Sequence, residues 1–338
     1  MVFYEALLSA FVGFVTVRLS APYIISFLKK KGIVRPDAHK PGNPIVAHSG
    51  GIIIFLGFTL STILFLLLIG DIDLKVKFLA VYFSGLMCFL VGLYDDLKIL
   101  RGIVKMALTV LGILPIIVFY MTFPDIIELG RPVVPFIGQI RITIIYWLLL
   151  PFAIAGASNV VNMIDIYNGV VPGMTMVALI GLLGASIVFN STLGLVFSII
   201  FLGVMLAYFP YNYYPAKVFN GDSGSLFIGA LLGAVAVVGK MEFIVLTLLL
   251  PHLINGFMIL VSFGGFKEHR EIKGRPVLVL NNGLLKANDD PNAPWSLTRI
   301  VLLIGGPASE KELSLFYIVS EILPSALAVI TASLMVMG

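Results

Sequence analysis

The stretch GIIIFLGFTLSTILFLLLIG, residues 51–70, carries no charged side chain between its two terminal glycines. A helix needs about twenty mainly apolar residues to cross the roughly 30 Å hydrocarbon core of a bilayer. The chain of 338 residues is 59% hydrophobic and 12% charged, with a mean hydropathy of +1.06. This composition excludes an ordinary soluble globular protein. The sequence therefore predicts an all-α polytopic membrane protein.

Similar apolar runs recur along the whole chain. They predict about ten transmembrane helices, at residues 3–28, 50–70, 76–94, 104–123, 141–158, 170–190, 193–210, 224–239, 241–264 and 313–336. The first run follows no basic leader or small-residue cleavage site, so we expect a retained span and not a signal peptide. Cys88 is the only cysteine, which rules out a disulfide within one chain. We expect one integral membrane domain over residues 1–338.

Basic residues are concentrated in alternate loops. Most of the 22 lysines and arginines belong to the loops at residues 29–49, 95–103, 159–169, 211–223 and 265–312. The positive-inside rule assigns this side to the cytoplasm and both termini to the outside, at the plasma membrane if the cell is prokaryotic. A basic face of this kind suits anionic lipid headgroups and phosphorylated ligands, and no nucleic-acid partner is expected.

We expect the longest loop, residues 265–312, to contain secondary structure of its own. Its segment RPVLVLNNGLLKA places Asn282 and Gly283 between two short extended runs, a favoured hairpin turn. We expect a small cytoplasmic β-hairpin there, followed by an amphipathic surface helix near Trp295.

The first polar motif is YDDLKILRGIVK, residues 94–105, at the cytoplasmic end of the third predicted span. Adjacent carboxylates near a membrane are costly unless a cation lies beside them. Asp95 and Asp96 therefore indicate a metal site or a base, and Lys105 can face the same pocket from the next span. The alternative is a pair of solvated loop acids that balance Lys98 and Arg101.

The second motif is SNVVNMIDIYNGV, residues 158–170. Its polar side chains recur every three residues, at Asn159, Asn162, Asp165 and Asn168, so one helical or 3-10 turn would put them on one face. Such a row of oxygen atoms suits a hard cation or a phosphate. An elaborate helix cap is the alternative.

The third motif is FNGDSGSLFIG, residues 219–229, which leads into an apolar run. Asp222 precedes this predicted helix, where a carboxylate can cap the backbone amides, and capping does not exclude metal binding. The string GDSGS is reminiscent of serine proteases, but no triad partner is visible beside the four histidines.

The fourth motif is FKEHREIKGRP, residues 266–276. Its basic side chains can clamp phosphate oxygens, or they can simply follow the positive-inside rule.

Together the acid and amide clusters come from distant spans yet share one membrane face. They indicate a divalent cation bound with a phosphate-rich ligand. Magnesium fits best because it prefers oxygen ligands and includes substrate phosphates in its coordination shell, with manganese as the alternative.

These motifs, in this order and at these membrane positions, resemble the polyprenyl-phosphate N-acetylhexosamine-1-phosphate transferase superfamily. The resemblance covers most of the chain. The segments NYYPAKVFNGD and GPASEKEL are more similar to the eukaryotic and archaeal dolichyl-phosphate GlcNAc-1-phosphate transferases than to the bacterial phospho-MurNAc-pentapeptide transferases. The family has ten transmembrane helices and a cytoplasmic active site. A homodimer is compatible with this resemblance.

The resemblance implies roles for the residues around the expected metal. Asn162 and Asp222 would bind magnesium, and Asp95 and Asp96 would lie beside it near the lipid phosphate. Lys105 would neutralise phosphate charge.

The resemblance also implies a nucleotide and pyrophosphate site. His269 and Arg270 would neutralise phosphate charge, and Asn168 and Phe219 fall where the family holds the uridine.

The first cytoplasmic loop, VRPDAHKPGNPIVAHSGG, resembles that of the family with Asp37 and Lys40 in register as substrate-binding residues. Two positions depart from the family pattern. His48 stands where a glutamate is frequent, and Glu268 stands where a basic residue is common.

The implied reaction is attack by a lipid phosphate oxygen on the β-phosphorus of UDP-GlcNAc, or of a related UDP-HexNAc. It would give lipid-PP-GlcNAc and UMP, the first step of lipid-linked glycan assembly. A multi-span solute transporter is the rival class. Transporters concentrate functional polar groups near the bilayer midplane, whereas the motifs here lie at helix ends on one side, which favours an interfacial enzyme.

Two charged residues fall deep inside predicted spans, Arg18 in the first and Glu321 in the last. Their similar depths suggest an ion pair, with snorkelling of Arg18 to the interface as the alternative.

Overall fold

The computed structural model describes residues 2–262 and 275–338, and helices dominate this part of the chain. The helices are α1 (Val2–Lys30), α2 (Gly51–Leu68), α3 (Ile72–Lys98), α4 (Gly102–Thr109), α5 (Leu114–Thr122), α6 (Thr143–Met163), α7 (Val170–Phe189), α8 (Thr192–Asn212), α9 (Gly221–Val238), α10 (Glu242–Leu248), α11 (Leu250–Ser262), α12 (Leu297–Gly305), α13 (Glu310–Ser320) and α14 (Ile322–Met337). A 3-10 turn, η1 (Val110–Ile113), joins α4 to α5.

The number of membrane-spanning helices agrees with the prediction. Nine helices within the described ranges are long and apolar enough to cross a membrane, where α4 with α5, and α13 with α14, each count as one. The pair α10 and α11 passes the same test together and raises the number to ten. The prediction of an all-α polytopic membrane protein is therefore confirmed.

The ninth predicted span, residues 241–264, is not one straight helix. Its halves α10 and α11 meet at an angle of 68°. Pro251 explains the bend, because proline lacks the amide that would bond the carbonyl one turn earlier and its ring crowds that carbonyl.

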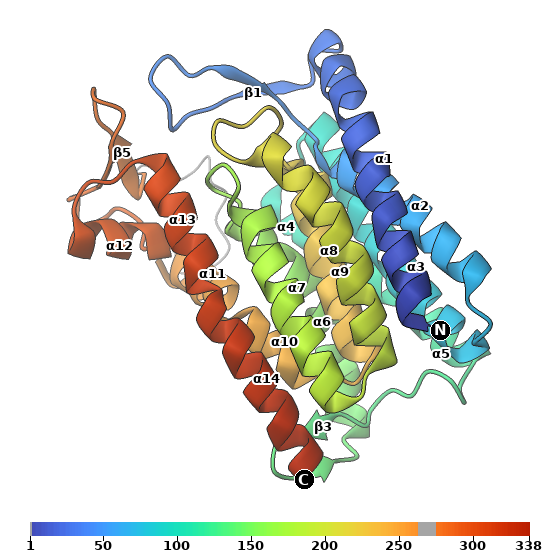
Figure 1. The fold of residues 1–338 in the computed structure, drawn as a ribbon. Coiled ribbons are helices and arrows are strands. Elements are labelled where there is room, and N and C mark those ends of the chain that lie inside the picture. Colours follow the sequence, from blue (N-terminus) through green and yellow to red (C-terminus); the bar gives the residue numbers. More distant parts are fainter. Residues whose placement is uncertain (1, 263–274) are drawn as a thin grey trace.

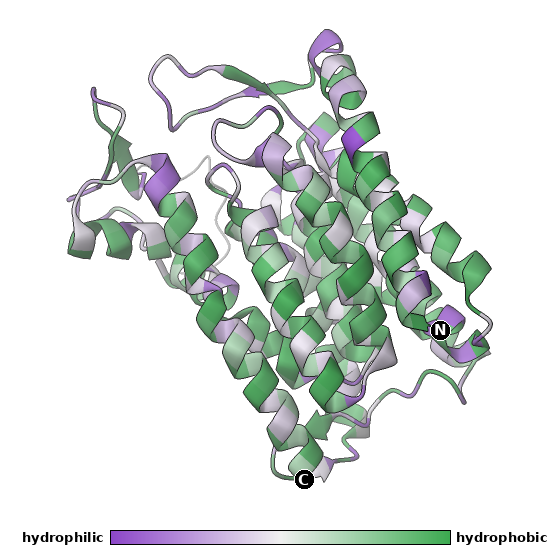
Figure 2. Ribbon diagram, in the orientation of Figure 1, coloured by the Kyte–Doolittle hydropathy of each residue, from purple (hydrophilic) through white to green (hydrophobic). Residues whose placement is uncertain are grey.

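The two ends of the helical bundle differ in character. Figure 1 shows the chain termini at one end, and the β1 and β5 hairpins at the other, which we call the loop end. Hydrophobic residues cover most of the helices, while hydrophilic residues gather in the loops (Figure 2). Three antiparallel hairpins complete the fold: β1 (Val34–Pro36) with β2 (Ile45–Ala47), β3 (Val133–Val134) with β4 (Gly138–Gln139), and β5 (Val277–Val279) with β6 (Leu285–Ala287).

The hairpin expected in the longest loop is present. Between β5 and β6 the amide of Gly283 donates to the Leu280 carbonyl at 2.9 Å, and Gly283 has a φ of +81°. Helix α12 follows just after Trp295, as predicted. The other two hairpins were not expected, because their strands are only two or three residues long.

Helix α9 forms the centre of the bundle. All of its residues except Asp222 are buried, and it packs mainly against α3 and α6. Small residues allow this close approach. A Cβ added to Gly229 would lie 2.5 Å from the Cα of Ser158 on α6. The polar start of α9 is therefore held inside the bundle at the loop end.

The proposed pairing of Arg18 with Glu321 is wrong. Arg18 is exposed, and its guanidinium lies 5.5 Å from the centre of the Tyr211 ring. Glu321 is fully buried, and its Oε2 lies 3.9 Å from Nδ1 of His252. Arg18 therefore faces outward from the bundle, whereas Glu321 faces inward.

Candidate functional site

Four helix ends converge at the loop end of the bundle. The end of α3 supplies Asp95, the start of α4 supplies Lys105, the end of α6 supplies Asn162, and the start of α9 supplies Asp222. We call these four residues the Asp222 cluster. The structure thus brings together four residues that the sequence had placed in three separate motifs.

The Asp222 carboxylate contacts two other members of this cluster. Lys105 Nζ lies 2.5 Å from Asp222 Oδ2 and 3.3 Å from Asp95 Oδ2. On the other side, Asn162 Nδ2 donates to Asp222 Oδ1 at 2.6 Å. The alternative role of Asp222 as a cap is wrong, because the residue lies inside α9 and its carboxylate contacts Lys105 and Asn162.

Asp96 caps α9 instead. It accepts hydrogen bonds from the Asp222 amide at 2.8 Å and from the Ser223 amide at 3.2 Å. Helix α3 runs through both aspartates to Lys98, so they are buried helical residues, and the alternative of solvated loop acids is wrong. On the helix they face different partners, Asp95 toward Lys105 and Asp96 toward the α9 amides.

Two glycines make this convergence sterically feasible. Gly221 has a φ of +69°, and a Cβ there would lie 2.5 Å from Asp96 Oδ2. Gly92, one turn before the aspartates on α3, faces the Asp222 carbonyl so closely that a Cβ would overlap it. Side chains at either position would push α3 and α9 apart.

The predicted row of four polar residues is only partly correct. Helix α6 ends at Met163, so the spacing of three residues does not continue along one face. Asn159 Nδ2 donates to Thr109 Oγ1 at 2.8 Å, outside the Asp222 cluster. Asp165 accepts from Asn220 Nδ2 at 2.8 Å, beside the start of α9. Burial raises the pKa of Asp165 to about 7.

Asn168, the last of that row, belongs to a second group with Asp37, Lys40 and Glu310, which we call the Lys40 cluster. Lys40 forms an ion pair with Asp37, and its Nζ lies 3.0 Å from Glu310 Oε2 and 2.9 Å from Asn168 Oδ1. The Asn168 amide donates to Glu310 Oε1 at 2.9 Å. One lysine thus ties the first loop, the loop before α7 and the start of α13 together.

His39 lies at the edge of the Lys40 cluster. Its ring centre is 4.8 Å from that of Tyr167, and burial lowers the pKa of His39 to about 4. Ligand atoms of Asp37, His39 and Glu310 lie within 4.8 Å of one another. Lys40 already supplies a positive charge among them, so this group has the character of a salt-bridged clamp.

Phe219 lies at the junction between the first loop and α9. Its amide donates to the Ala47 carbonyl at 2.8 Å, and its carbonyl accepts from the Gly50 amide at 2.8 Å. The ring is partly exposed, so it can contact a ligand.

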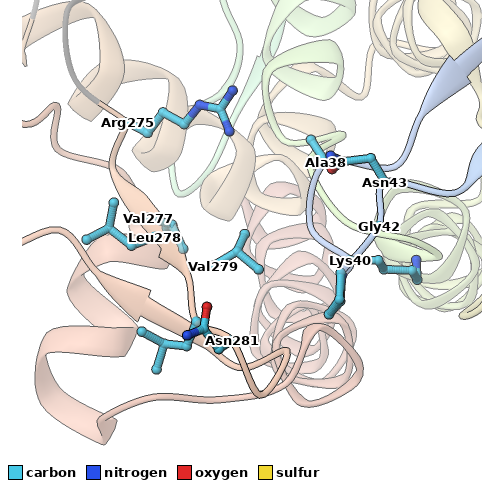
Figure 3. A pocket seen from close by; sticks show the side chains of 11 residues that line it. Ala38, Lys40, Gly42, Asn43, Arg275, Val277, Leu278, Val279 and Asn281 are labelled. Carbon is cyan, nitrogen blue, oxygen red and sulfur yellow. The ribbon is translucent and has the colours of Figure 1, made fainter.

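A cavity of about 440 Å³ separates the first loop from β5. Figure 3 shows Lys40 and Asn43 on one side and Arg275 and Asn281 on the other. Arg275 is the basic residue of the motif at residues 266–276 that lies within the described ranges. His269, Arg270 and Glu268 lie outside the described residues.

The Asp222 cluster fits a hard divalent cation. Asp95, Asn162 and Asp222 offer carboxylate and amide oxygens, the donors that magnesium and manganese take in proteins. In the described ranges, Lys105 is the one cation within ion-pair distance of Asp95 and Asp222. The Lys105 ammonium carries one positive charge, whereas the two carboxylates together carry two negative charges. A metal ion would compensate the remaining negative charge.

Three residues of the site were not assigned from the sequence. Ser223 and His48 contact Asp96, at 2.6 Å through Ser223 Oγ and at 3.1 Å through His48 Nε2. Glu310 completes the Lys40 cluster. The only signal for Glu310 was its place in GPASEKEL, where Ser309 and Glu312 form the capping box that starts α13. His48 was noted as a departure at the edge of the site, yet it lies against a central carboxylate.

Comparison with known proteins identifies relatives over most of the chain. The family described as Glycosyl transferase family 4 matches residues 78–240. A Saccharolobus solfataricus protein, provisionally named UDP-N-acetylglucosamine–dolichyl-phosphate N-acetylglucosaminephosphotransferase, is 32% identical over 88% of this chain and 87% of its own length. A protein of the same name from Sulfolobus acidocaldarius is 29% identical over 88% of both chains. The phospho-N-acetylmuramoyl-pentapeptide-transferase of Streptococcus mutans is 28% identical over 79% of this chain and 82% of its own.

Proposed function

The chain belongs to the polyprenyl-phosphate N-acetylhexosamine-1-phosphate transferases of glycosyl transferase family 4, and we propose that it transfers GlcNAc-1-phosphate, or a related HexNAc-1-phosphate, from a UDP-sugar to dolichyl or another polyprenyl phosphate. The products are lipid-PP-sugar and UMP. The convergence of four span ends in the Asp222 cluster carries this proposal.

The position of the cluster supports an enzyme over a transporter. Asp95, Asn162 and Asp222 all lie within the last or first turn of their spans, at the loop end of the bundle. An acceptor held in lipid and a donor dissolved in water meet at such a boundary, whereas transporters usually bind their solute near the midplane.

Asn162 and Asp222 would hold a magnesium ion, with manganese as the alternative. Such an ion neutralises phosphate charge and orients the pyrophosphate when bound. Lys105 adds a fixed positive charge beside it. His269 and Arg270 are assigned to the same task at the pyrophosphate on the strength of the sequence resemblance.

The Lys40 cluster and Phe219 would bind the nucleotide part of the donor. Asn168 and Phe219 are assigned to the uridine, and Asp37 and Lys40 to the donor side of the site. Lys40 fixes the buried Asn168 side chain through a 2.9 Å hydrogen bond, which supports a preformed site.

In the reaction, an oxygen of the lipid phosphate bonds to the β-phosphorus of the UDP-sugar. The bond from that phosphorus to the bridging oxygen breaks, and UMP leaves with the bridging oxygen. No strong base is required, since a phosphomonoester with a second pKa of about 6 is already largely a dianion at neutral pH. Asp95 and Asp96 act as electrostatic and positioning groups, and proton removal by one of them is the competing assignment.

The orientation follows from the basic loops. We place the loop end in the cytoplasm and both termini outside, because the loop end carries most of the lysines and arginines.

Purified protein in detergent, with magnesium, a polyprenyl phosphate and one UDP-sugar at a time, tests the proposal. UMP should form only when lipid and sugar donor are both present, with UDP-GlcNAc or a related UDP-HexNAc preferred over UDP-glucose. Solute counterflow in liposomes without UMP release would instead support the transporter.

A further inference from the structure

The Asp96 carboxylate is surrounded by hydrogen-bond donors. Asp96 Oδ1 accepts from the Asp222 amide at 2.8 Å and faces His48 Nε2 at 3.1 Å. Oδ2 accepts from the Ser223 amide at 3.2 Å and from Ser223 Oγ at 2.6 Å. The side chain is only 1% exposed. Oδ2 thus has two donors, and Oδ1 has one donor with the His48 ring nitrogen at contact distance.

This environment differs from that of the neighbouring Asp95. Asp95 accepts from the Leu100 amide at 2.5 Å and faces Lys105 at 3.3 Å, which leaves part of its acceptor capacity free. Asp96 has less acceptor capacity left for a metal or a proton, because three hydrogen bonds and the His48 contact surround it. Its donors include the first amides of α9, where a carboxylate is stabilised by the helix dipole.

The backbone around His48 is fixed to the start of α9. The His48 amide donates to the Ile33 carbonyl at 3.0 Å. Just beyond it, the amides of Gly50 and Gly51 donate to the carbonyls of Phe219 and Asn220, both at 2.8 Å. These backbone bonds hold the loop that brings His48 to Asp96, with little freedom to move away.

We propose that His48 is a positioning residue for the reaction, which donates from Nε2 to Asp96 and so holds Asp96 as the cap that aims the Asp222 carboxylate at the metal site. This inference rests on the proposed function and gives the two adjacent aspartates different roles. Asp95 faces the reacting groups, and Asp96 serves the architecture of α9. A charge-assisted bond of this kind acts on the ligand through its neighbour, as outer-shell partners of metal ligands do.

Two variants of similar size test whether the N–H donor of His48 is required. His48→Gln keeps an N–H group near the position of Nε2, and His48→Met fills similar space without one. Manganese binding is measured by the loss of the free Mn²⁺ electron paramagnetic resonance signal, with thermal melting as the check on folding. We expect His48→Met to weaken Mn²⁺ affinity about tenfold, the usual scale for an outer-shell partner, and His48→Gln to stay near wild type.

The rate of UMP release gives the second readout. His48→Met should lower kcat and raise the Mg²⁺ concentration needed for half-maximal rate, while the KM for the UDP-sugar stays close to wild type. His252→Gln, at a buried histidine on α11 that faces Glu321, controls for general disturbance of the bundle and should leave Mn²⁺ binding unchanged.

Equal Mn²⁺ affinity of His48→Met and wild type would overturn the inference, as would failure of His48→Gln to restore binding in a folded protein. Wild-type protein that binds no Mn²⁺ would overturn it too. If His48→Met fails to fold, the inference can still be overturned by folded His48→Gln. A Mn²⁺ affinity of this variant at or below one tenth of the wild-type affinity would do so. Wild type that binds Mn²⁺ but releases no UMP contradicts the proposed function alone, because the binding comparison stands without turnover.

Discussion

Asp222 holds two different partners on its two carboxylate oxygens. Lys105 lies at 2.5 Å from one oxygen, and Asn162 donates to the other at 2.6 Å. In the account proposed above, this carboxylate also binds the metal. Its negative charge, more than its shape, should therefore decide whether the site works.

Asp222→Asn tests this, since the variant keeps the shape and removes the charge. We expect UMP release to fall at least about 100-fold, because preorganised charge is the main source of catalysis in such a site. Rates are compared by coupled UMP assay at saturating Mg²⁺, and thermal melting checks that the protein is folded. Activity within a few-fold of wild type would exclude Asp222 as a metal ligand.

His39 makes a second prediction, which concerns pH. Its pKa is about 4 in the folded protein against 6.5 for a free side chain, because burial disfavours the charged ring. Unfolding therefore takes up a proton between these values, and His39 destabilises the folded state as the pH falls from about 6.5 to 4. His39→Phe keeps a ring beside Tyr167 and cannot titrate. Its melting temperature should fall less steeply over this range than that of wild type, and parallel profiles would contradict the assignment.

At the scale of elements, α9 is positioned by its close approach to α3 and α6. Gly229 faces the α6 backbone at Ala157 and Ser158, so α9 has no room there for even one methyl group. This contact lies about two turns below Asp222 along the helix, and a change there should tilt the polar end as well.

Gly229→Ala should lower thermal stability, by about 1–3 kcal/mol if overpacking follows its usual cost. Gly156→Ala on α6 is the matched control, since a Cβ there has no neighbour within 4 Å among the described residues. That change should be neutral or slightly stabilising, because alanine favours helix over glycine. Equal melting temperatures for the two variants would show that the α6–α9 contact is looser than described.

The elements also show what could be predicted from sequence. Uncharged runs such as residues 51–70 predicted the spans, because bilayer thickness dictates their length. The bend before Pro251 was missed, since the two halves together are apolar enough to form one span. The different roles of Asp95 and Asp96 were also missed, because adjacent helical residues face about 100° apart and sequence alone does not say which partner each one meets.

At the scale of the site, motif order predicted the Asp222 cluster well. Asp95, Lys105, Asn162 and Asp222 do meet, since each was placed at the same end of a span. Asn168 was grouped with Asn162 only because regular spacing assumed a continuing helix, which ends at Met163. Glu310 could not be foreseen, because its partner Lys40 lies far away in the chain.

For the whole molecule, the positions of the termini and the loop end make the orientation testable. Both termini lie at the end opposite the Asp222 cluster (Figure 1). Cys88 is buried and is the only cysteine, so a Cys88→Ala background is free of native thiols.

Single cysteines in that background should label differently in intact cells. Asp125→Cys, in the loop after α5, should react with a membrane-impermeant maleimide, whereas Lys31→Cys, after α1, should react only once the cells are permeabilised. The reverse pattern would place the loop end outside and contradict the proposed cytoplasmic site.

The most direct test of the central claim follows the β-phosphorus of the donor. Purified protein is given Mg²⁺, a polyprenyl phosphate and UDP-GlcNAc labelled with ³²P at the β-phosphate, and the label is then partitioned between water and organic solvent. If the Asp222 cluster carries out phosphosugar transfer, the label moves into the lipid phase as unlabelled UMP appears in water, and Asp222→Asn abolishes this movement. Label that stays in water, as UDP or as unchanged donor, would contradict the account.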